Sequence, residues 1–434
     1  MRGEIVSSVI ASTVAEHHPG PQTQERGQRA VFCGLTSIIW LHRRIQDAFF
    51  LVVGSRTCAH LIQSAAGVMI FAEPRFATAI LGERDLAGMA DCHEELDRVV
   101  SELITRRSGI NRLFLVGSCP SEVIKLDLET AAAKLQAKHE NKVRISAFSG
   151  SGIETTFTQG EDQCLKSTAA ELPALPSGEA NLIVLGTVSD IVEDQFRRIF
   201  DDLGISNVHF YPGRKADDLP AVGKGTRLVA AQPFVGETVR ALIERGADII
   251  TAPFPLGAEG SKSWFEAISK AYGVDDARVQ QTLELPYQRA KRAIETQAAK
   301  LKGKRIHFLP DSQLEIPMAR FLSEECGLTI NEIGTPFHDQ LVMRGELARL
   351  PPDVCIVEGQ DLDPALNRVR EARPDLTVCG MGIANALESE GLRTKWSIEL
   401  VFSPVQGFDQ AGDLASLFAK PLIRESILEV GSWS

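Results

Sequence analysis

The stretch LFLVGSCPSEVIKLD, residues 113–127, reads as a buried strand, a turn and the start of a helix. Residues 113–116 are an apolar run of strand length, and a Gly-Ser pair ends it. Pro120 suits the first turn of a helix, where its missing N–H would have no partner, and residues 121–136 carry helix formers at helical spacing. We therefore expect Cys119 between a strand's carboxyl end and a helix N-terminus, where ligand sites of open α/β sheets collect. A small buried apolar cysteine is the alternative.

Strand-like apolar runs alternate with helical patterns along the whole chain. The runs lie at 48–54, 113–117, 143–150, 181–186, 227–231, 306–310 and 354–359. Helical patterns follow most of them, for example at 237–246 and 315–327. This alternation predicts an α/β fold of Rossmann-like domains with parallel sheets and helices on both faces.

Two breaks divide the chain into units that each restart with a strand. Residues 171–180 contain Pro and Gly after a polar stretch, and a charged helical pattern at 284–304 leads into the next strand. A chain of 434 residues is too long for one core. We expect a flexible arm over 1–30 and three α/β domains at 31–170, 171–297 and 298–434.

Composition excludes some classes of protein. A net charge of -11 argues against a general nucleic-acid binder, which needs a basic face. No apolar run approaches the roughly 18 residues of a membrane span, and the N-terminus has no apolar core of signal-peptide type. We expect a cytoplasmic protein, whose eight cysteines are then no disulfide framework.

Three of the cysteines share one setting. Cys33 precedes a glycine, Cys58 follows the strand-like run at 48–54 through a polar turn, and Cys119 stands in the Gly-Ser-Cys-Pro turn. Glycine lets the backbone approach a bulky ligand, and a helix N-terminus lowers the pKa of a thiol. Three thiolates at one sheet edge would bind an iron–sulfur cluster, although a zinc site and three buried thiols stay open as alternatives. A cubane cluster takes four protein ligands, so the fourth would be an unusual side chain or a partner's residue.

The remaining cysteines give no such pattern. No pair has the spacing C-x-x-C of zinc ribbons and redox dithiols. Cys326, Cys355 and Cys379 are interpreted as structural, and Cys92 and Cys164 are left open. The sequence also lacks the P-loop GxxxxGK[ST], so any ATP in the reaction should be held by another protein.

Four long stretches resemble one known family. They are residues 27–81, 115–129, 148–165 (FSGSGIETTFTQGEDQCL) and 402–418 (FSPVQGFDQAGDLASLF). They resemble the N subunits of light-independent (dark-operative) protochlorophyllide reductase, a nitrogenase-like family. The turn at Cys119 also matches the C-P-x-x-L-I-x-x-D pattern of nitrogenase α subunits, in which that cysteine binds a cluster.

The resemblance implies a site and a fold. The family's cluster cysteines fall on Cys33, Cys58 and Cys119, and its fourth ligand is an aspartate of the B subunit. Phe32 matches an aromatic residue of the pigment pocket, with a plain core aromatic as the alternative. No catalytic residue is expected in this chain. His60 is interpreted as a histidine that packs against a helix or supports a cluster ligand, rather than as a proton donor. The fold would be nitrogenase α-like, with the segment 396–408 packing toward the active site or forming a plain packed loop.

The resemblance also implies an enzyme that is active only as a complex. Two N and two B subunits would form a heterotetramer with a [4Fe-4S] cluster between N and B. A separate iron–sulfur ATPase homodimer, the reductase, would bind MgATP and deliver single electrons, making the enzyme ferredoxin- and ATP-dependent. Protochlorophyllide would be reduced at the ring D C17=C18 double bond to chlorophyllide, a step of chlorophyll and bacteriochlorophyll biosynthesis in photosynthesis.

Three other functions stay open at this point. They are a subunit of chlorophyllide reductase, a non-catalytic scaffold for assembly of a nitrogenase-type cofactor, and an α/β protein that uses its thiols for zinc or redox sensing. The FTQGEDQCL stretch and the cysteine spacing favour the N subunit over chlorophyllide reductase.

Overall fold

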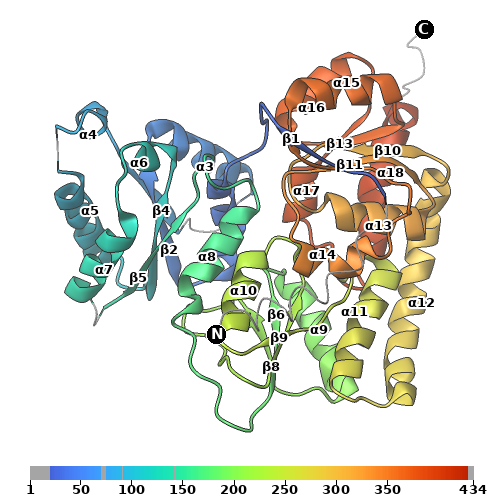
Figure 1. Cartoon of the computed structure of the whole chain (residues 1–434), viewed down its shortest axis with the longest axis horizontal. Helices are drawn as coiled ribbons and strands as arrows, with labels where there is room; N and C mark the ends of the chain where they lie inside the picture. Colours follow the sequence, from blue (N-terminus) through green and yellow to red (C-terminus); the bar gives the residue numbers. More distant parts are fainter. Residues whose placement is uncertain (1–19, 70–74, 90, 140–141, 429–434) are drawn as a thin grey trace, which may run out of the picture. The chain divides into compact units, whose positions relative to one another are not determined.

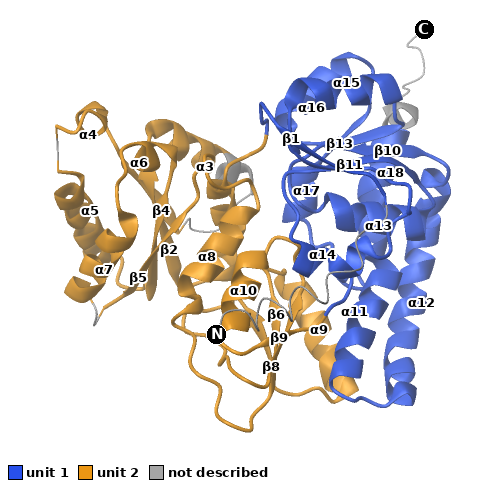
Figure 2. Ribbon diagram, viewed as in Figure 1, with its two compact units in different colours: residues 1–30, 251–434 blue, residues 31–250 orange. Residues whose placement is uncertain are grey.

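The computed structural model describes residues 20–69, 75–89, 91–139 and 142–428, which fold into the two compact units of Figure 2. Unit 1 comprises residues 1–30 and 251–434, and unit 2 comprises residues 31–250. In the described residues, unit 2 contains two four-stranded sheets and unit 1 one six-stranded sheet, as Figure 1 shows. Every strand pairing is parallel. The expected α/β fold with parallel sheets is confirmed.

The first sheet of unit 2 has the strand order β3-β2-β4-β5. Its strands are β2 (Ala48–Gly54), β3 (Phe76–Ile80), β4 (Arg112–Gly117) and β5 (Arg144–Ser149). The helices around it are η1 (Gly34–Ser37), α2 (Ile38–Arg44), α3 (Arg56–Met69), α4 (Glu83–Leu86), α5 (Cys92–Arg106), α6 (Cys119–Val123), α7 (Leu128–His139) and α8 (Gln159–Ala169). Strands β2 and β4 are buried along their whole length, which is why both read as continuous apolar runs.

Both faces of this sheet are covered. Val100 of α5 and Leu135 of α7 pack with the apolar side chains of one face. On the other face, Phe50 stacks on Phe114 with ring centroids 4.9 Å apart, and Phe114 meets Phe148 edge-on at 5.8 Å. Full burial of each such side chain contributes about 1.5–3 kcal/mol. The sheet is therefore a well-packed base for the loops at its carboxyl edge.

The helix expected over residues 121–136 is interrupted. Helix α6 ends at Val123 and α7 begins at Leu128. Lys125 adopts a left-handed backbone conformation with φ 54°, which no continuous helix can accommodate. The Asp127 carboxylate accepts a hydrogen bond of 2.9 Å from Thr130 N, as an N-cap does. The prediction was wrong here because the capping signal of Asp127 was read as part of a helix interior.

The second sheet of unit 2 has the order β7-β6-β8-β9. Its strands are β6 (Asn181–Leu185), β7 (Val208–Tyr211), β8 (Thr226–Ala230) and β9 (Asp248–Ile249), with helices α9 (Asp190–Leu203) and α10 (Gly236–Glu244). Buried polar contacts join the two sheets of unit 2. The Arg44 guanidinium lies 2.5 Å from the Glu193 carboxylate, and the Asp162 carboxylate accepts bonds from the backbone N–H groups of Glu237 and Thr238.

The six-stranded sheet of unit 1 has the order β1-β12-β11-β10-β13-β14. Its strands are β1 (Gln22–Arg26), β10 (Arg305–Phe308), β11 (Thr329–Thr335), β12 (Ile356–Gln360), β13 (Leu376–Cys379) and β14 (Thr394–Trp396). The helices of unit 1 are α11 (Gly257–Ala271), α12 (Asp276–Leu301), α13 (Glu315–Cys326), α14 (Gln340–Leu347), α15 (Leu362–Ala372), α16 (Met381–Ser389), α17 (Ser397–Phe402) and α18 (Ala411–Leu428).

The N-terminal segment differs from the expected flexible arm in its described part. Residues 22–26 form the edge strand β1, which pairs with β12 from Gln22–Ile356 to Arg26–Gln360. Residues 1–19 lie outside the described residues.

The domain boundaries expected from the sequence differ from the division into units. Residues 251–297 belong to unit 1, whereas we expected them in the second domain, and the domain boundaries stay predictions. In the described part of the chain, no helix is long and apolar enough to cross a membrane.

Candidate metal centre

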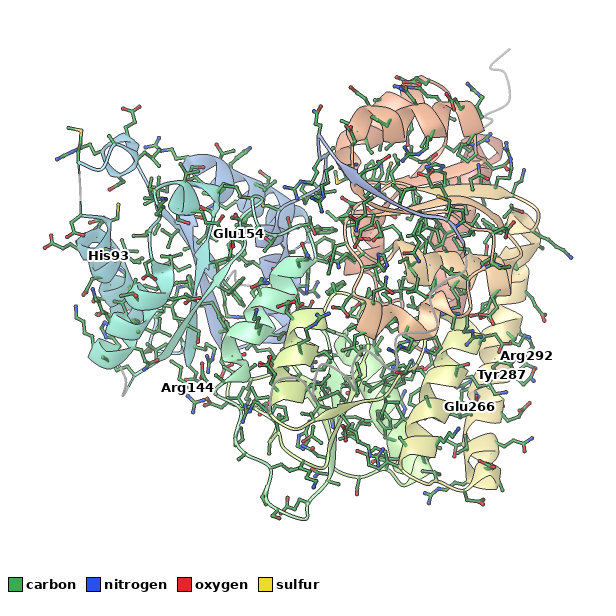
Figure 3. All side chains as sticks on the ribbon, viewed as in Figure 1. His93, Arg144, Glu154, Glu266, Tyr287 and Arg292 are labelled. Atoms are coloured by element: carbon green, nitrogen blue, oxygen red, sulfur yellow. The ribbon has the colours of Figure 1, made fainter. Side chains whose placement is uncertain are left out.

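The three cysteines of the predicted cluster lie at the carboxyl edge of the β3-β2-β4-β5 sheet. Cys58 is in the first turn of α3, just after β2, and Cys119 is the first residue of α6, just after β4. Cys33 precedes η1 and forms a β-bridge with Thr156, in the loop that follows β5. Figure 3 shows Glu154 of this loop and Arg144, the first residue of β5, at opposite ends of the strand.

Two glycines pack closely beside the thiols. A Cβ on Gly152 would come within 3.2 Å of Cys33 Cβ and 3.6 Å of Cys119 Sγ, and Gly152 N donates a hydrogen bond of 3.2 Å to the same sulfur. A Cβ on Gly54 would come within 3.2 Å of Cys58 Sγ. At Gly54 the added Cβ would also lie 2.6 Å from Ser118 Oγ. Glycine at these positions therefore lets the segments that carry the cysteines approach one another closely. Sequence reasoning missed both residues, although Gly54 ends the strand-like run at 48–54 and Gly152 follows the run at 143–150.

Short polar contacts fix the loops that carry the cysteines. Ser118 Oγ donates a bond of 2.6 Å to Val53 O, which ties the turn of Cys119 to the strand before Cys58. Leu35 N donates a bond of 2.9 Å to Gly150 O, which ties the segment after Cys33 to the loop after β5. The Glu122 carboxylate accepts bonds from the hydroxyls of Ser149 and Ser151. All three loops are therefore held to one another.

The electrostatic setting of Cys33 differs from that of a reactive surface thiol. Burial raises the pKa of the Cys33 thiol to about 11, and negative charge on Cys119 and Cys58 acts in the same direction, while a backbone hydrogen bond with Leu35 lowers the pKa. A free Cys33 is thus protonated at neutral pH. A metal ion deprotonates the thiol that coordinates it, so binding here would release a proton.

The donor set fits a polynuclear cluster. Within the described residues, no group of three or more His, Cys, Asp or Glu side chains is arranged to hold a metal ion. In an iron–sulfur cluster each thiolate binds its own iron, so the sulfurs need not meet at one point. Three thiols on separate segments at one sheet edge meet this requirement.

Three exposed apolar side chains lie on the segments that carry the thiols and their neighbouring glycines, or are paired with them. Ile80 at the end of β3 is 49% exposed, Val123 at the end of α6 is 70% exposed, and Ile153 after Gly152 is 53% exposed. Ile80 is paired in register with Gly54. Exposed apolar residues that form a contiguous patch mark interaction surfaces. We call these three residues the apolar rim.

Phe32 is half-buried, and its ring lies 5.8 Å from the ring of Phe157. His60 is exposed on α3, which argues against packing in a helix interface, and a supporting role beside Cys58 stays a prediction. Cys92 donates a weak hydrogen bond to the Asp85 carboxylate, and Cys164 is buried in α8. The role of Phe32 stays a prediction.

The other predicted residues lie in unit 1. Cys326 and Cys379 are buried and Cys355 is half-buried. Phe408, at the end of the 396–408 segment, is buried, and its ring stacks on Phe265 at 6.0 Å. A cavity of about 550 Å³ lies beside the ends of β1 and β12, but none of the predicted site residues lines it.

Comparison with known proteins first gives the class. A family model described as "Nitrogenase component 1 type Oxidoreductase" matches residues 33–423. The solved structure "Nitrogenase Cp1 at pH 6.5" shares the fold with a TM-score of 0.72 at 15% identity, over 94% of this chain and 96% of that chain. The structure "Nitrogenase Cp1 at pH 5" has a TM-score of 0.69 at 13% identity, over 93% and 91%.

Curated relatives then give the family. "Light-independent protochlorophyllide reductase subunit N" of Halorhodospira halophila is 66% identical over 95% of this chain and 97% of the relative. The proteins of that name from Bradyrhizobium sp. (strain ORS 278) and Acidiphilium rubrum are 59% and 61% identical, over 97% and 94% of this chain and 99% and 96% of the relatives. Within the nitrogenase component 1 type oxidoreductases, the chain therefore belongs to the N subunits of light-independent protochlorophyllide reductase.

Proposed function

We propose that this chain holds a [4Fe-4S] cluster through Cys33, Cys58 and Cys119 and works in the two-electron reduction of protochlorophyllide to chlorophyllide. The reduced bond is the ring D C17=C18 double bond. The fourth cluster ligand comes from a B subunit, with which the chain forms an N2B2 heterotetramer in the cytoplasm. The observation that carries the proposal is the arrangement of three thiols and two glycines at one sheet edge, in a chain of this family.

The residues of this chain have separable tasks. The three thiolates bind iron, and Gly54 and Gly152 allow the close approach of the segments that carry them. When bound, the cluster supplies one-electron transfer. Phe32 contributes an aromatic wall of the pigment pocket. No P-loop is present in the sequence, so MgATP is bound by the reductase, which docks transiently.

The apolar rim supports a shared site. Ile80, Val123 and Ile153 are all about half exposed or more, beside thiols that provide three ligands where a cubane needs four. Obligate interfaces bury more than about 2,000 Å² and resemble a protein core. A B subunit seated on the rim would cover these side chains and supply the missing ligand. The chain alone would then be largely without iron, poorly soluble and inactive.

The test compares anaerobic preparations of the chain alone and co-expressed with a B subunit. Iron, sulfide and the visible absorption spectrum are measured after gel filtration. We expect a dark complex with equal N and B content, and Cys119→Ser should lower bound iron and abolish protochlorophyllide reduction. Cys326→Ala is the matched control, because this buried thiol lies in unit 1 and should be dispensable for iron. A fully active, fully loaded Cys119→Ser complex would refute the ligand assignment.

The same measurements separate the other functions. Bound zinc in place of iron would favour a zinc or redox thiol protein. A complex that binds iron without reducing any pigment would favour a cofactor scaffold. Reduction of chlorophyllide, but not of protochlorophyllide, would favour the related reductase. A soluble lone chain with full cluster iron would require a fourth ligand within this sequence.

A further inference from the structure

The FTQGEDQCL stretch, residues 157–165, leads into α8 and forms its first two turns. It carries two buried carboxylates that are adjacent in the sequence. Glu161 is fully buried and Asp162 is 6% exposed. Buried carboxylates are costly unless each oxygen is hydrogen-bonded. Asp162 meets this requirement by capping α10, where it accepts two backbone N–H bonds of 2.8 Å and the Thr238 hydroxyl at 2.6 Å. Glu161 has different partners.

Each oxygen of the Glu161 carboxylate accepts one N–H bond. Trp40 Nε1 donates to one oxygen at 2.5 Å, and Thr187 N donates to the other at 2.6 Å. Trp40 lies in α2, on the segment that continues from Cys33, and Thr187 follows β6 of the second sheet. Burial raises the pKa of Glu161 to about 7, against the lowering effect of these two donors. Glu161 thus anchors the Trp40 indole to the second sheet of unit 2.

A chain of aromatic contacts leads from Trp40 to Phe32. The Trp40 ring meets Phe157 edge-on at 5.8 Å, and Phe157 lies 5.8 Å from Phe32 at an angle of 57°. Phe157 is fully buried, so it cannot move away without displacing its neighbours. Edge-to-face pairs contribute about 0.5–1.5 kcal/mol each beyond their buried area. The orientation of Phe32 therefore depends on the Trp40 ring behind it.

Backbone contacts join the same two segments. Gly160 packs against Gly34 so closely that a Cβ there would lie 2.7 Å from the Gly34 carbonyl carbon. Cys33 itself is bridged to Thr156. The segment 32–40 is thus supported along its length by the start of α8.

We propose that Glu161 is a positioning residue for Phe32 and Cys33: its two hydrogen bonds fix Trp40, and Trp40 fixes the aromatic wall of the pigment site through Phe157. The inference rests on the proposed function, since it assigns Phe32 to the pigment and Cys33 to iron. The hydrogen bonds described for the Glu161 carboxylate go to Trp40 and Thr187, so Glu161 acts on Phe32 and Cys33 through other residues.

The test is a double-mutant cycle on the complex with the B subunit. A glutamine side chain has one acceptor oxygen, so Glu161→Gln leaves either Trp40 Nε1 or Thr187 N facing an NH₂ group. Trp40→Phe removes one of these two donors, and the amide oxygen can then serve Thr187. We therefore expect Glu161→Gln to weaken binding in the Trp40 background and to have little effect in the Trp40→Phe background.

The readouts do not require turnover. Binding of protochlorophyllide is titrated by absorbance without reductase or ATP, and the reduced cluster is examined by electron paramagnetic resonance. We expect Glu161→Gln to raise the dissociation constant about fivefold or more, equivalent to about 1 kcal/mol, and to shift the resonance of the cluster. Asp162→Asn is the matched control, because it changes the neighbouring buried carboxylate that caps α10; it should lower the melting temperature and leave both readouts unchanged.

The results of the double-mutant cycle decide whether Glu161 positions Phe32 and Cys33. An equal effect of Glu161→Gln in both backgrounds, or no effect in either, overturns the positioning role. If Glu161→Gln alone does not assemble, the double variant must do so, and failure of both also overturns it. A wild-type complex without iron and without pigment binding instead refutes the proposed function.

Discussion

Gly160→Ala should destabilise unit 2, although alanine is the better helix former. Gly160 is the second residue of α8. Replacing a helix glycine by alanine contributes up to about 1 kcal/mol of stability. Here the added Cβ would lie 2.5 Å from Ser37 Oγ and 2.7 Å from the Gly34 carbonyl carbon. Because a backbone carbonyl cannot rotate away as a side chain can, the segment after Cys33 must move.

The balance of these terms gives the size of the effect. Overpacking of a close contact costs about 1–3 kcal/mol, and the clash with backbone argues for the upper end. After the helix-propensity gain, a net loss of about 2 kcal/mol remains. For a unit of this size, that lowers the melting temperature by about 4–8 °C. The displaced Cys33 should also reduce bound iron.

Gly382→Ala is the matched control for this experiment. Gly382 is likewise the second residue of a helix, α16, but a Cβ there would meet nothing within 4 Å. The assay is thermal melting of the anaerobic complex followed by iron analysis. Gly382→Ala should leave the melting temperature unchanged or slightly raised. If Gly160→Ala behaves in the same way and keeps its iron, the close packing of α8 on the segment after Cys33 is refuted.

Three further predictions concern stability and nucleotide use. Burial raises the Glu161 pKa from 4.5 to about 7, so the stability that this group contributes is full below about pH 4.5 and is lost as the pH rises through 7. Glu161→Gln should therefore remove up to about 3 kcal/mol of the fall in the free energy of unfolding between pH 5 and 8 and flatten the pH dependence of the melting temperature, and an unchanged slope would contradict the shift. Arg320→Ala should cost about 3–5 kcal/mol, because it leaves the buried carboxylates of Glu346 and Glu325 without their cation; Arg370→Ala, at an exposed ion pair, should leave the melting temperature almost unchanged, and equal effects of the two substitutions would refute the stabilising role of the buried network. The complex without its reductase should release no phosphate from MgATP, and turnover in that assay would reveal a nucleotide site in this chain or the B subunit.

Most of the strands predicted from the sequence are buried interior strands, and most edge strands were missed. The exceptions are the edge strand β5, which was predicted, and the interior strands β11 and β13, which were not. The run at 48–54 coincides with β2 because both faces of that strand are covered, so every side chain is apolar. Strand β1, by contrast, has the polar sequence QTQER and is mostly exposed. It forms because β12 offers an edge with free backbone groups, and nothing local in residues 22–26 encodes that partner.

The candidate site also has local features that could be predicted from the sequence and long-range contacts that could not. The setting of Cys119 is local, since a strand, a turn and Pro120 follow one another in the sequence, and the structure places the residue as expected at the first position of α6. The contacts of Gly152 with Cys33, and of Glu161 with Trp40, join segments more than a hundred residues apart. Single-sequence patterns carry no signal for such pairs, because each residue alone is ordinary for its helix or loop.

The pairing of β1 with β12 sets an order of events during synthesis. Unit 2 is inserted into unit 1 in the chain, and Gln24 is separated from its hydrogen-bond partner Glu358 by 334 residues. At about 5–20 residues per second, a ribosome needs roughly 20–70 s to make the intervening chain. Unit 2 can fold in that interval, while the sheet of unit 1 cannot be completed. In a nascent chain, β1 therefore stays unpaired until β12 has been synthesised, late in translation. During that interval β1 is accessible to chaperone binding.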